Sequence, residues 1–392
     1  MTIFIQNITW SIKLSLNVFL LSGMWKPEGM SVFKNILYYF YFFLFYMCMT
    51  GIYIIIQAGD LLLIWGDISL MTANFFLLFT NVALSVKMFN IVLRGSEIKA
   101  LVRDCDRELR EETTEDGKVI IASYKKEAQR QLYVYIFLTY ATILGWSLSA
   151  EKGQLPMRAW YPFDTSKSPA YQLTYVHQCL AVAIGAGVDV GTDTLVTSLV
   201  SQCRCRLRLL DLSLRTLCDG FQVEETGLIA PDAEEVIYLR LRRCVQRHRA
   251  VLNDAQLLQD CFSIATLSQF TVSIFIICVT AYQLAFESKT IIGVASMIFY
   301  LVTMMMQVFI YCYQGNQLVV ESEAISAAAY ECPWYSCRAP LRLALLVIMT
   351  RATRSFKLTA ANLTELSLAT FVSIIKASYT FFTVLQGVVD VS

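Results

Sequence analysis

Seven long stretches without charged side chains constrain this chain more than any motif does. A helix rises about 1.5 Å per residue and the hydrocarbon core of a bilayer is about 30 Å thick, so about 20 apolar residues span it. Runs of this length predict membrane-spanning helices rather than buried soluble ones. The stretches cover residues 35–59, 68–86, 131–150, 168–188, 261–286, 290–320 and 366–389, the last interrupted by Lys376.

The composition agrees with a membrane protein and excludes several classes of function. Of the 392 residues, 56% are hydrophobic and 16% are charged, whereas a soluble domain carries about 25% charged residues. The formal net charge of +1 provides no basic field for nucleic acid. The chain has two histidines, too few for most zinc sites or histidine-based catalysis. We therefore expect no enzyme activity, no metal or other cofactor and no nucleic-acid partner.

The lysines and arginines predict which way the chain crosses the membrane. If the N-terminus is cytoplasmic, 25 of the 32 basic residues fall in cytoplasmic segments and 4 fall outside. Positively charged side chains are retained on the cytoplasmic side. We therefore predict seven spans with the N-terminus in the cytoplasm and the C-terminus outside the cell, the reverse of a G-protein-coupled receptor.

Two of the apolar stretches continue as helical patterns beyond the length that a bilayer needs. Leucines and valines then recur at helical spacing through 200–261, where Pro231 and Asp232 are typical of a helix start. We predict an all-α membrane protein whose seven transmembrane helices carry cytoplasmic extensions that form an anchor domain. The expected parts are a cytoplasmic amphipathic segment 1–30, four spans in 31–200, helical extensions 201–261, two spans in 262–313, an anchor segment 314–357, the last span in 358–389 and an extracellular tail 390–392.

The last span mixes polar and bulky side chains. An isolated charge at the bilayer centre costs about 2.5–3.5 kcal/mol, so Lys376 should face protein or water. Tyr379, Phe382, Thr383 and Gln386 share one helical stripe. Two interpretations remain open: the stripe packs against other helices, or it lines a water-filled conduit.

The C-terminal part of the chain, from Ala329 onward, contains a series of specific sequence elements. They are Ala329-Tyr330-Glu331, Trp334-Tyr335, Arg342, Leu345-Leu346, Leu358-Thr359-Ala360, Leu366-Ser367-Leu368, Thr370-Phe371 and the run from Ile374 to Tyr379. A Trp-Pro element stands before the first span, with one residue inserted between Trp25 and Pro27. These elements resemble those of a known family, the insect odorant receptors, and the layout of the whole chain is similar to that family.

The resemblance implies a subunit of an odour-gated, non-selective cation channel in the plasma membrane of olfactory neurons. Such a subunit assembles with a shared co-receptor subunit as a tetramer, and four copies of the last span surround the pore. Tyr379, Phe382, Thr383 and Gln386 would then face the pore, with Phe382 or Val384 as the apolar constriction that closes it.

The resemblance also implies where a small volatile odorant binds, which is between the outer halves of the second, third, fourth and sixth spans. An apolar, aromatic pocket with few polar groups suits such a ligand, because burial supplies most of the affinity. His177 is the best polar candidate, although it could instead bond a neighbouring helix. The candidate ligand-binding residues are Phe75, Phe76, Phe79, Ile143, Trp146, His177, Ala181, Ile184, Met297 and Tyr300.

Three alternatives fit the sequence less well. Gustatory receptors share the topology but place five residues between Thr-Tyr and Gln-Phe in the last span, whereas six residues separate Ser378-Tyr379 from Gln386-Gly387 here. The shared co-receptor itself has a much longer cytoplasmic segment than 200–261, so the resemblance indicates a tuning receptor. A transporter should show an internal repeat with broken helices, and we find none in the sequence.

Overall fold

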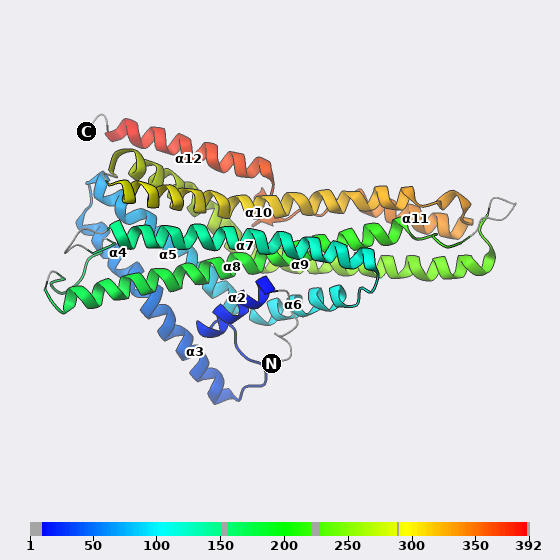
Figure 1. The fold of residues 1–392 in the computed structure, drawn as a ribbon, viewed down its shortest axis with the longest axis horizontal. Helices are drawn as coiled ribbons and strands as arrows, with labels where there is room; N and C mark the ends of the chain where they lie inside the picture. The colour runs from blue at the N-terminus through cyan, green and yellow to red at the C-terminus, as the bar shows by residue number, and fades with distance from the viewer. Residues whose placement is uncertain are drawn as a thin grey trace.

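The computed structural model describes residues 10–149, 155–157, 159–165, 167–221, 228–287 and 290–389, and these residues are almost entirely α-helical. Within them, seven helices are long and apolar enough to cross a membrane (Figure 1). The all-α, seven-span prediction is therefore confirmed. The expected extracellular tail at 390–392 lies outside the described residues.

The seven candidate spans follow the apolar stretches of the sequence. The first span is built from three consecutive pieces, because a π-helical turn separates two α-helices. The spans are α3 (Val32–Tyr46) with η1 (Met47–Gly51) and α4 (Ile52–Leu63), α5 (Ile68–Leu93), α7 (Glu115–Ser149), α8 (Ala170–Arg215), α9 (Pro231–Tyr282) with the π-helical η2 (Gln283–Glu287), α10 (Ile291–Glu331) and α12 (Leu368–Val389).

Shorter elements connect the spans or pack on their sides. The helix α6 is amphipathic, and Ile98, Leu101, Val102 and Cys105 form its buried face. A hairpin of two short strands precedes the last span, and its turn contains Asn362 with a φ of 58°. The shorter elements are α2 (Trp10–Leu21), α6 (Gly95–Arg110), η3 (Trp334–Ser336), α11 (Ala339–Ala352), β1 (Thr359–Ala360) and β2 (Thr364–Glu365), with Thr359 paired antiparallel to Glu365.

Three spans are about twice as long as a bilayer requires. The helices α8, α9 and α10 contain 46, 52 and 41 residues, whereas about 20 suffice. They lie lengthwise beside one another and extend, with α11, well beyond the N-terminal end of α12 (Figure 1). The helix α9 begins at Pro231, where the sequence predicts a helix start.

The helix α8 is the central element of the bundle, and every residue from Val190 to Leu207 is buried. This run includes two arginines, whose charges are balanced by neighbouring helices. Arg204 binds Glu127 of α7 at 3.0 Å and Glu321 of α10 at 3.1 Å. Arg206 binds Asp254 of α9 at 2.5 Å and also pairs with Glu108 of α6. Because buried charges need such partners, the two arginines fix four helices around α8.

The hairpin of β1 and β2 packs against α9 and α10, just before the chain enters α12. Gln259 of α9 donates to the carbonyl oxygen of Thr359 at 2.7 Å and accepts from its amide at 2.8 Å. On α10, a Cβ at Gly315 would lie 2.5 Å from the Leu366 Cβ and closer still to its carbonyl oxygen. A glycine at 315 is therefore required for this contact.

We expect Gly315→Ala to destabilise the protein by about 1–3 kcal/mol, because overpacking forces the hairpin to move. The readout is the melting temperature of the detergent-solubilised protein. Gly95→Ala is the matched control, since no atom lies within 4 Å of the Cβ that it adds. Equal melting temperatures for the two variants would show that the hairpin is not tightly seated on α10.

Candidate functional site

A cavity lies among the helices α4, α5, α7, α8 and α10. The space open to the centres of water-sized spheres is about 100 Å³, well above the roughly 10–15 Å³ that a single water needs. Its lining is mostly apolar, which is typical of a site for a small organic molecule. The lining residues used below are Tyr53, Gln57, Thr80, Asn81, Tyr135, Ile143, Trp146, Met157, Ala181, Asp189 and Tyr300.

Two aromatic side chains, Trp146 and Tyr300, form one wall of the cavity, and Phe76 packs on both of them. The ring centroids of Trp146 and Tyr300 are 5.0 Å apart, and Phe76 lies 5.6 Å from the first and 5.8 Å from the second. The Tyr300 hydroxyl is 2.9 Å from the Thr80 hydroxyl. The helices α7 and α10 come close here, because Gly145 faces Ser296 and a Cβ on this glycine would lie 2.6 Å from the serine Cβ. Gly145 thus brings Trp146 against Tyr300.

A loop segment between α7 and α8 is held against the cavity by one buried glutamine. Gln178 of α8 accepts from the Met157 amide at 3.2 Å and donates to the Met157 carbonyl oxygen at 3.1 Å. It also donates to the Tyr161 hydroxyl at 2.9 Å. Burial raises the pKa of Tyr161, which keeps this hydroxyl protonated. The side chain of Met157 is thereby fixed in the cavity wall.

The π-helical turn in the first span is tied to α8 through His177. Its Nε2 lies 3.1 Å from the Cys48 carbonyl oxygen and therefore donates to it. Its Nδ1 lies 3.1 Å from the Tyr53 hydroxyl, and its ring stacks on Tyr53 with centroids 5.4 Å apart. His177 thus holds Tyr53 in position. Tyr53 lines the cavity, whereas His177 does not.

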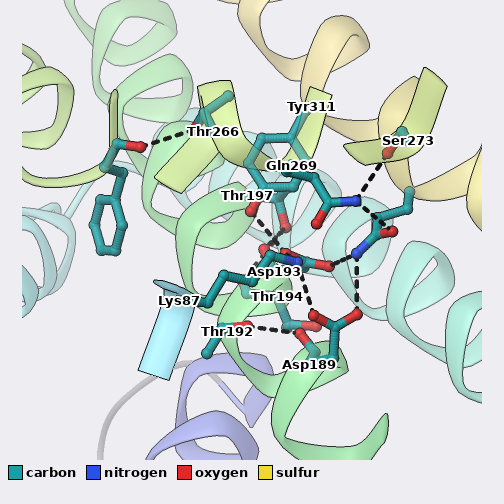
Figure 2. A network of polar contacts seen from close by, with 12 residues as sticks. Lys87, Asp189, Thr192, Asp193, Thr194, Thr197, Thr266, Gln269, Ser273 and Tyr311 are labelled. Carbon is teal, nitrogen blue, oxygen red and sulfur yellow. Dashed lines mark hydrogen bonds and ion pairs between the residues drawn. The ribbon is translucent and has the colours of Figure 1, made fainter. Parts of the chain in front are cut away.

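The cavity floor carries buried charges. Asp189 of α8 lines the cavity, and Asp193 lies one helical turn deeper. The Lys87 ammonium from α5 bridges the two carboxyl groups, at 2.8 Å from Asp189 and 2.7 Å from Asp193 (Figure 2). One cation and two carboxylates give the described cluster a formal charge of −1. Removing charged carboxylates from water costs free energy, so hydrogen-bond donors must surround them in the protein.

Donors from two more helices bind this cluster directly, and a third helix reaches it through Gln307. Tyr135 of α7 donates to Asp193 at 2.9 Å, and Tyr311 of α10 donates to it at 2.8 Å. Gln307 of α10 donates to Asp189 at 3.0 Å and in turn accepts from Gln269 of α9 at 2.8 Å. The cluster therefore connects the cavity floor to α9 and α10.

Four of the ten candidate ligand-binding residues line the cavity, namely Ile143, Trp146, Ala181 and Tyr300. Phe76, Phe79 and Met297 belong to the hydrophobic cluster around this wall. Phe75 stacks on Phe79 at 5.3 Å, and Ile184 is exposed on the outside of α8. His177 stands behind Tyr53, as described above.

The first span and the polar floor of the cavity were not predicted from the sequence. Tyr53 and Gln57 line the cavity from α4, and Gln57 accepts from Asn81 at 3.0 Å. Their signal was present, because Tyr53, Gln57 and Asp60 are spaced four and three residues apart in an otherwise apolar helix. Such spacing places polar groups on one helix face.

The helix α12 lies at the edge of the bundle beside α10 and packs mainly on α9 and α10 (Figure 1). Its buried face includes Ile374 and Ser378. Its opposite face is an exposed polar stripe of Ser373, Lys376, Thr380 and Thr383.

The five candidate pore residues do not all lie on this stripe. Thr383 belongs to it, while Tyr379 and Val384 are exposed on its two sides. Gln386 is half-buried. Phe382 is half-buried and lies 6.5 Å from Phe286, between ring centroids. Across the described ranges, no group of three or more histidine, cysteine or acidic side chains could hold a metal ion.

The chain matches the family model described as 7tm odorant receptor over residues 67–379. It is 24% identical to odorant receptor Or1 of Anopheles gambiae over 391 residues, which cover 93% of this chain and 92% of that receptor. It is 27% identical to putative odorant receptor 85d of Drosophila melanogaster over 59% of this chain and 54% of that receptor.

Solved structures show the same fold. The olfactory receptor OR5 of the insect Machilis hrabei, in complex with eugenol, superposes with a TM-score of 0.82 at 18% identity. The match covers 97% of this chain and 98% of that receptor. A second structure of the same receptor matches with a TM-score of 0.78 over the same shares of both chains. These matches confirm the resemblance found in the sequence.

We expect Lys87→Met to destabilise the protein by about 3–5 kcal/mol, because it leaves two buried carboxylates without their cation. The melting temperature of the solubilised protein is the readout. Lys118→Met is the control, since its pair with Glu115 is exposed and such pairs contribute about 0–1 kcal/mol. A Lys87 variant as stable as the control would mean that the cluster is not ionised.

Proposed function

Because the chain belongs to the 7tm odorant receptor family, which comprises multi-pass membrane receptors of olfaction and not enzymes, we propose that it is the odorant-binding subunit of a ligand-gated, non-selective cation channel. It acts in the plasma membrane of olfactory neurons as a tuning receptor. Its partner is a shared co-receptor subunit, and the two assemble as a heterotetramer.

The exposed polar stripe of α12 carries the channel part of this proposal. Ser373, Lys376, Thr380 and Thr383 are exposed on the helix face opposite the buried Ile374 and Ser378. The Lys376 side chain has no ion-pair partner among the described residues. A charge facing lipid at this depth would cost about 2.5–3.5 kcal/mol. A water-filled pore, enclosed by α12 helices of several subunits, removes this cost.

The same stripe refines the pore-facing residues. Thr383 lines the pore, with Tyr379 and Gln386 on one side of the stripe and Val384 on the other. Val384 is 59% exposed and is our choice for the apolar constriction, since an apolar ring closes a pore by excluding water. Phe382 instead helps to seat α12 against Phe286.

The orientation and the anchor domain follow from charge and helix length. With the N-terminus inside, 25 of 32 basic residues are cytoplasmic, and α12 runs outward to an extracellular C-terminus. The ends of α8, α9 and α10, together with α11, then project into the cytoplasm as the anchor (Figure 1). The anchor comprises the helical extensions 201–261 and the segment 314–357.

The cavity is the odorant site in this proposal, and α9 and α10 connect it to α12. Tyr300 and Met304 of α10 line the cavity, while Phe309 of the same helix packs on Phe371 of α12 at 5.6 Å. An odorant opens the pore only by binding more tightly to the open arrangement of these helices than to the closed one.

A second connection runs through three aromatic rings. Phe275 of α9 lies 5.7 Å from Phe79 of α5 and 5.7 Å from Phe381 of α12. A shift of α5 against α9 would therefore change the packing of α12 through the Phe275 ring.

The test of this function is co-expression with an insect co-receptor in oocytes, with currents recorded across a panel of volatiles. We expect odour-evoked current only when both subunits are present.

Trp146→Ala and Tyr300→Ala should shift half-maximal concentrations by about 10–100-fold and reorder the ligands, because each removes a buried aromatic contact. The reversal potential should not change. Altered permeation with unchanged ligand order would contradict this assignment, and G-protein signalling without current would contradict the channel.

The pore assignment is tested by cysteine modification. We expect Thr380→Cys and Thr383→Cys channels to lose most of their odour-evoked current in a charged methanethiosulfonate reagent, because both positions face water. Ser378→Cys is the matched control, since Ser378 is buried against the bundle, and unmodified channels report on the native cysteines. Modification of position 378 with protection of 380 and 383 would place a different face of α12 in the pore.

A further inference from the structure

We propose that the odorant of this receptor carries a hydrogen-bond donor, a hydroxyl or a protonated amine, and that Asp189 accepts it at the cavity floor. This inference rests on the proposed function of the cavity as the odorant site, and it names the chemical class of the ligand.

Asp189 is the member of the buried cluster that the cavity reaches. It lines the cavity, and Asp193 does not. The side chain of Asp189 is 17% exposed, against 4% for Asp193. A ligand that fills the cavity therefore touches the first carboxylate and is separated from the second.

The hydrogen bonds of the two carboxylates differ in the same direction. A carboxylate offers about four acceptor positions. Asp193 accepts from Lys87, Tyr311, Tyr135 and Gln307, so its positions are filled. Asp189 accepts from Lys87, Gln307 and, at 3.4 Å, Tyr135. Within the described residues, its Oδ1 accepts from Lys87 alone, which leaves a position for a ligand donor.

The charge balance favours a donor over an acceptor. The described cluster holds two carboxylates and the Lys87 ammonium (Figure 2). Among the described residues, the partners of the carboxylates are this ammonium, two tyrosine hydroxyls and the Gln307 amide, all of which donate. A ligand ether or carbonyl oxygen near Asp189 would meet like partial charge. A ligand O–H or N–H would make a charge-assisted hydrogen bond, the stronger kind.

The remainder of the lining determines the rest of the ligand. Trp146, Tyr300 and Ile143 present apolar surface away from the floor. The other hydroxyls are largely engaged, since Thr139 bonds the Tyr135 carbonyl at 2.8 Å and Thr80 bonds the Phe76 carbonyl at 2.7 Å. A compact aromatic or aliphatic body with one donor at its end therefore fits the cavity.

The test compares matched compounds in oocytes that co-express the receptor with a co-receptor. Benzyl, phenylethyl, hexyl and octyl scaffolds are each offered as the alcohol, the amine, the methyl ether and the hydrocarbon. We expect the alcohol or the amine to act at concentrations about tenfold or more below the methyl ether on the best scaffold. A larger effect of the amine identifies the ligand as cationic, and a larger effect of the alcohol identifies it as neutral.

The measured quantity is the ratio of the half-maximal concentrations of the alcohol and the methyl ether. Asp189→Asn should bring this ratio close to one, because it removes the charge that strengthens the hydrogen bond. Asp193→Asn makes the same chemical change one turn deeper and should keep the preference. The ratio is measured within each variant, so altered expression does not affect it. If a variant does not reach the membrane, the wild-type ratio alone still shows whether the receptor prefers a ligand with a hydrogen-bond donor. Equal or better activation by ethers and hydrocarbons would overturn the inference, whereas the absence of any odour-evoked current would contradict the proposed function itself.

Discussion

The structure depends on buried charges along one helix. The helix α8 runs through the centre of the bundle and carries Asp189, Asp193, Arg204 and Arg206 in its buried part. A charge removed from water is tolerated only where partners balance it, so each of these side chains dictates what the facing helix must present. Lys87 forms ion pairs with the aspartates, and four acidic residues from α6, α7, α9 and α10 form ion pairs with the arginines. The packing order of the helices around α8 follows from these pairs.

These pairs divide the molecule into a fixed part and a freer part. The cavity lies beside the aspartate cluster, and the projecting helices are joined at the arginines. The last span takes part in none of these ion pairs. In its most apolar stretch, 11% of the residues are buried, against 56% in the corresponding stretch of α9. A helix held on one face by aromatic contacts has little to lose by moving. The element that we assign to the pore is therefore the one that is least constrained within the subunit.

The sequence predicted the parts of the fold that depend on local patterns. Apolar runs predicted the seven spans, and Pro231 predicted the start of α9. The positions of Trp146 and Tyr300 were instead predicted from the resemblance to the odorant receptors. The contacts that were missed depend on distant residues. The burial of Arg204 and Arg206 has no local signal, because their partners Glu127 and Asp254 are 77 and 48 residues away. The rotation of α12 could not be predicted from its own stripe, since α12 packs on distant rings, Phe275 of α9 and Phe286 of η2.

A structure of the receptor assembled with its co-receptor in a lipid membrane tests the central claim most directly. The account predicts a tetramer in which α12 of each subunit surrounds a water-filled axis, with Lys376 and Thr383 facing water and with the N-terminus in the cytoplasm. A tetramer whose axis is lined by another helix, with the polar face of α12 turned toward lipid or toward a neighbouring subunit, would contradict it.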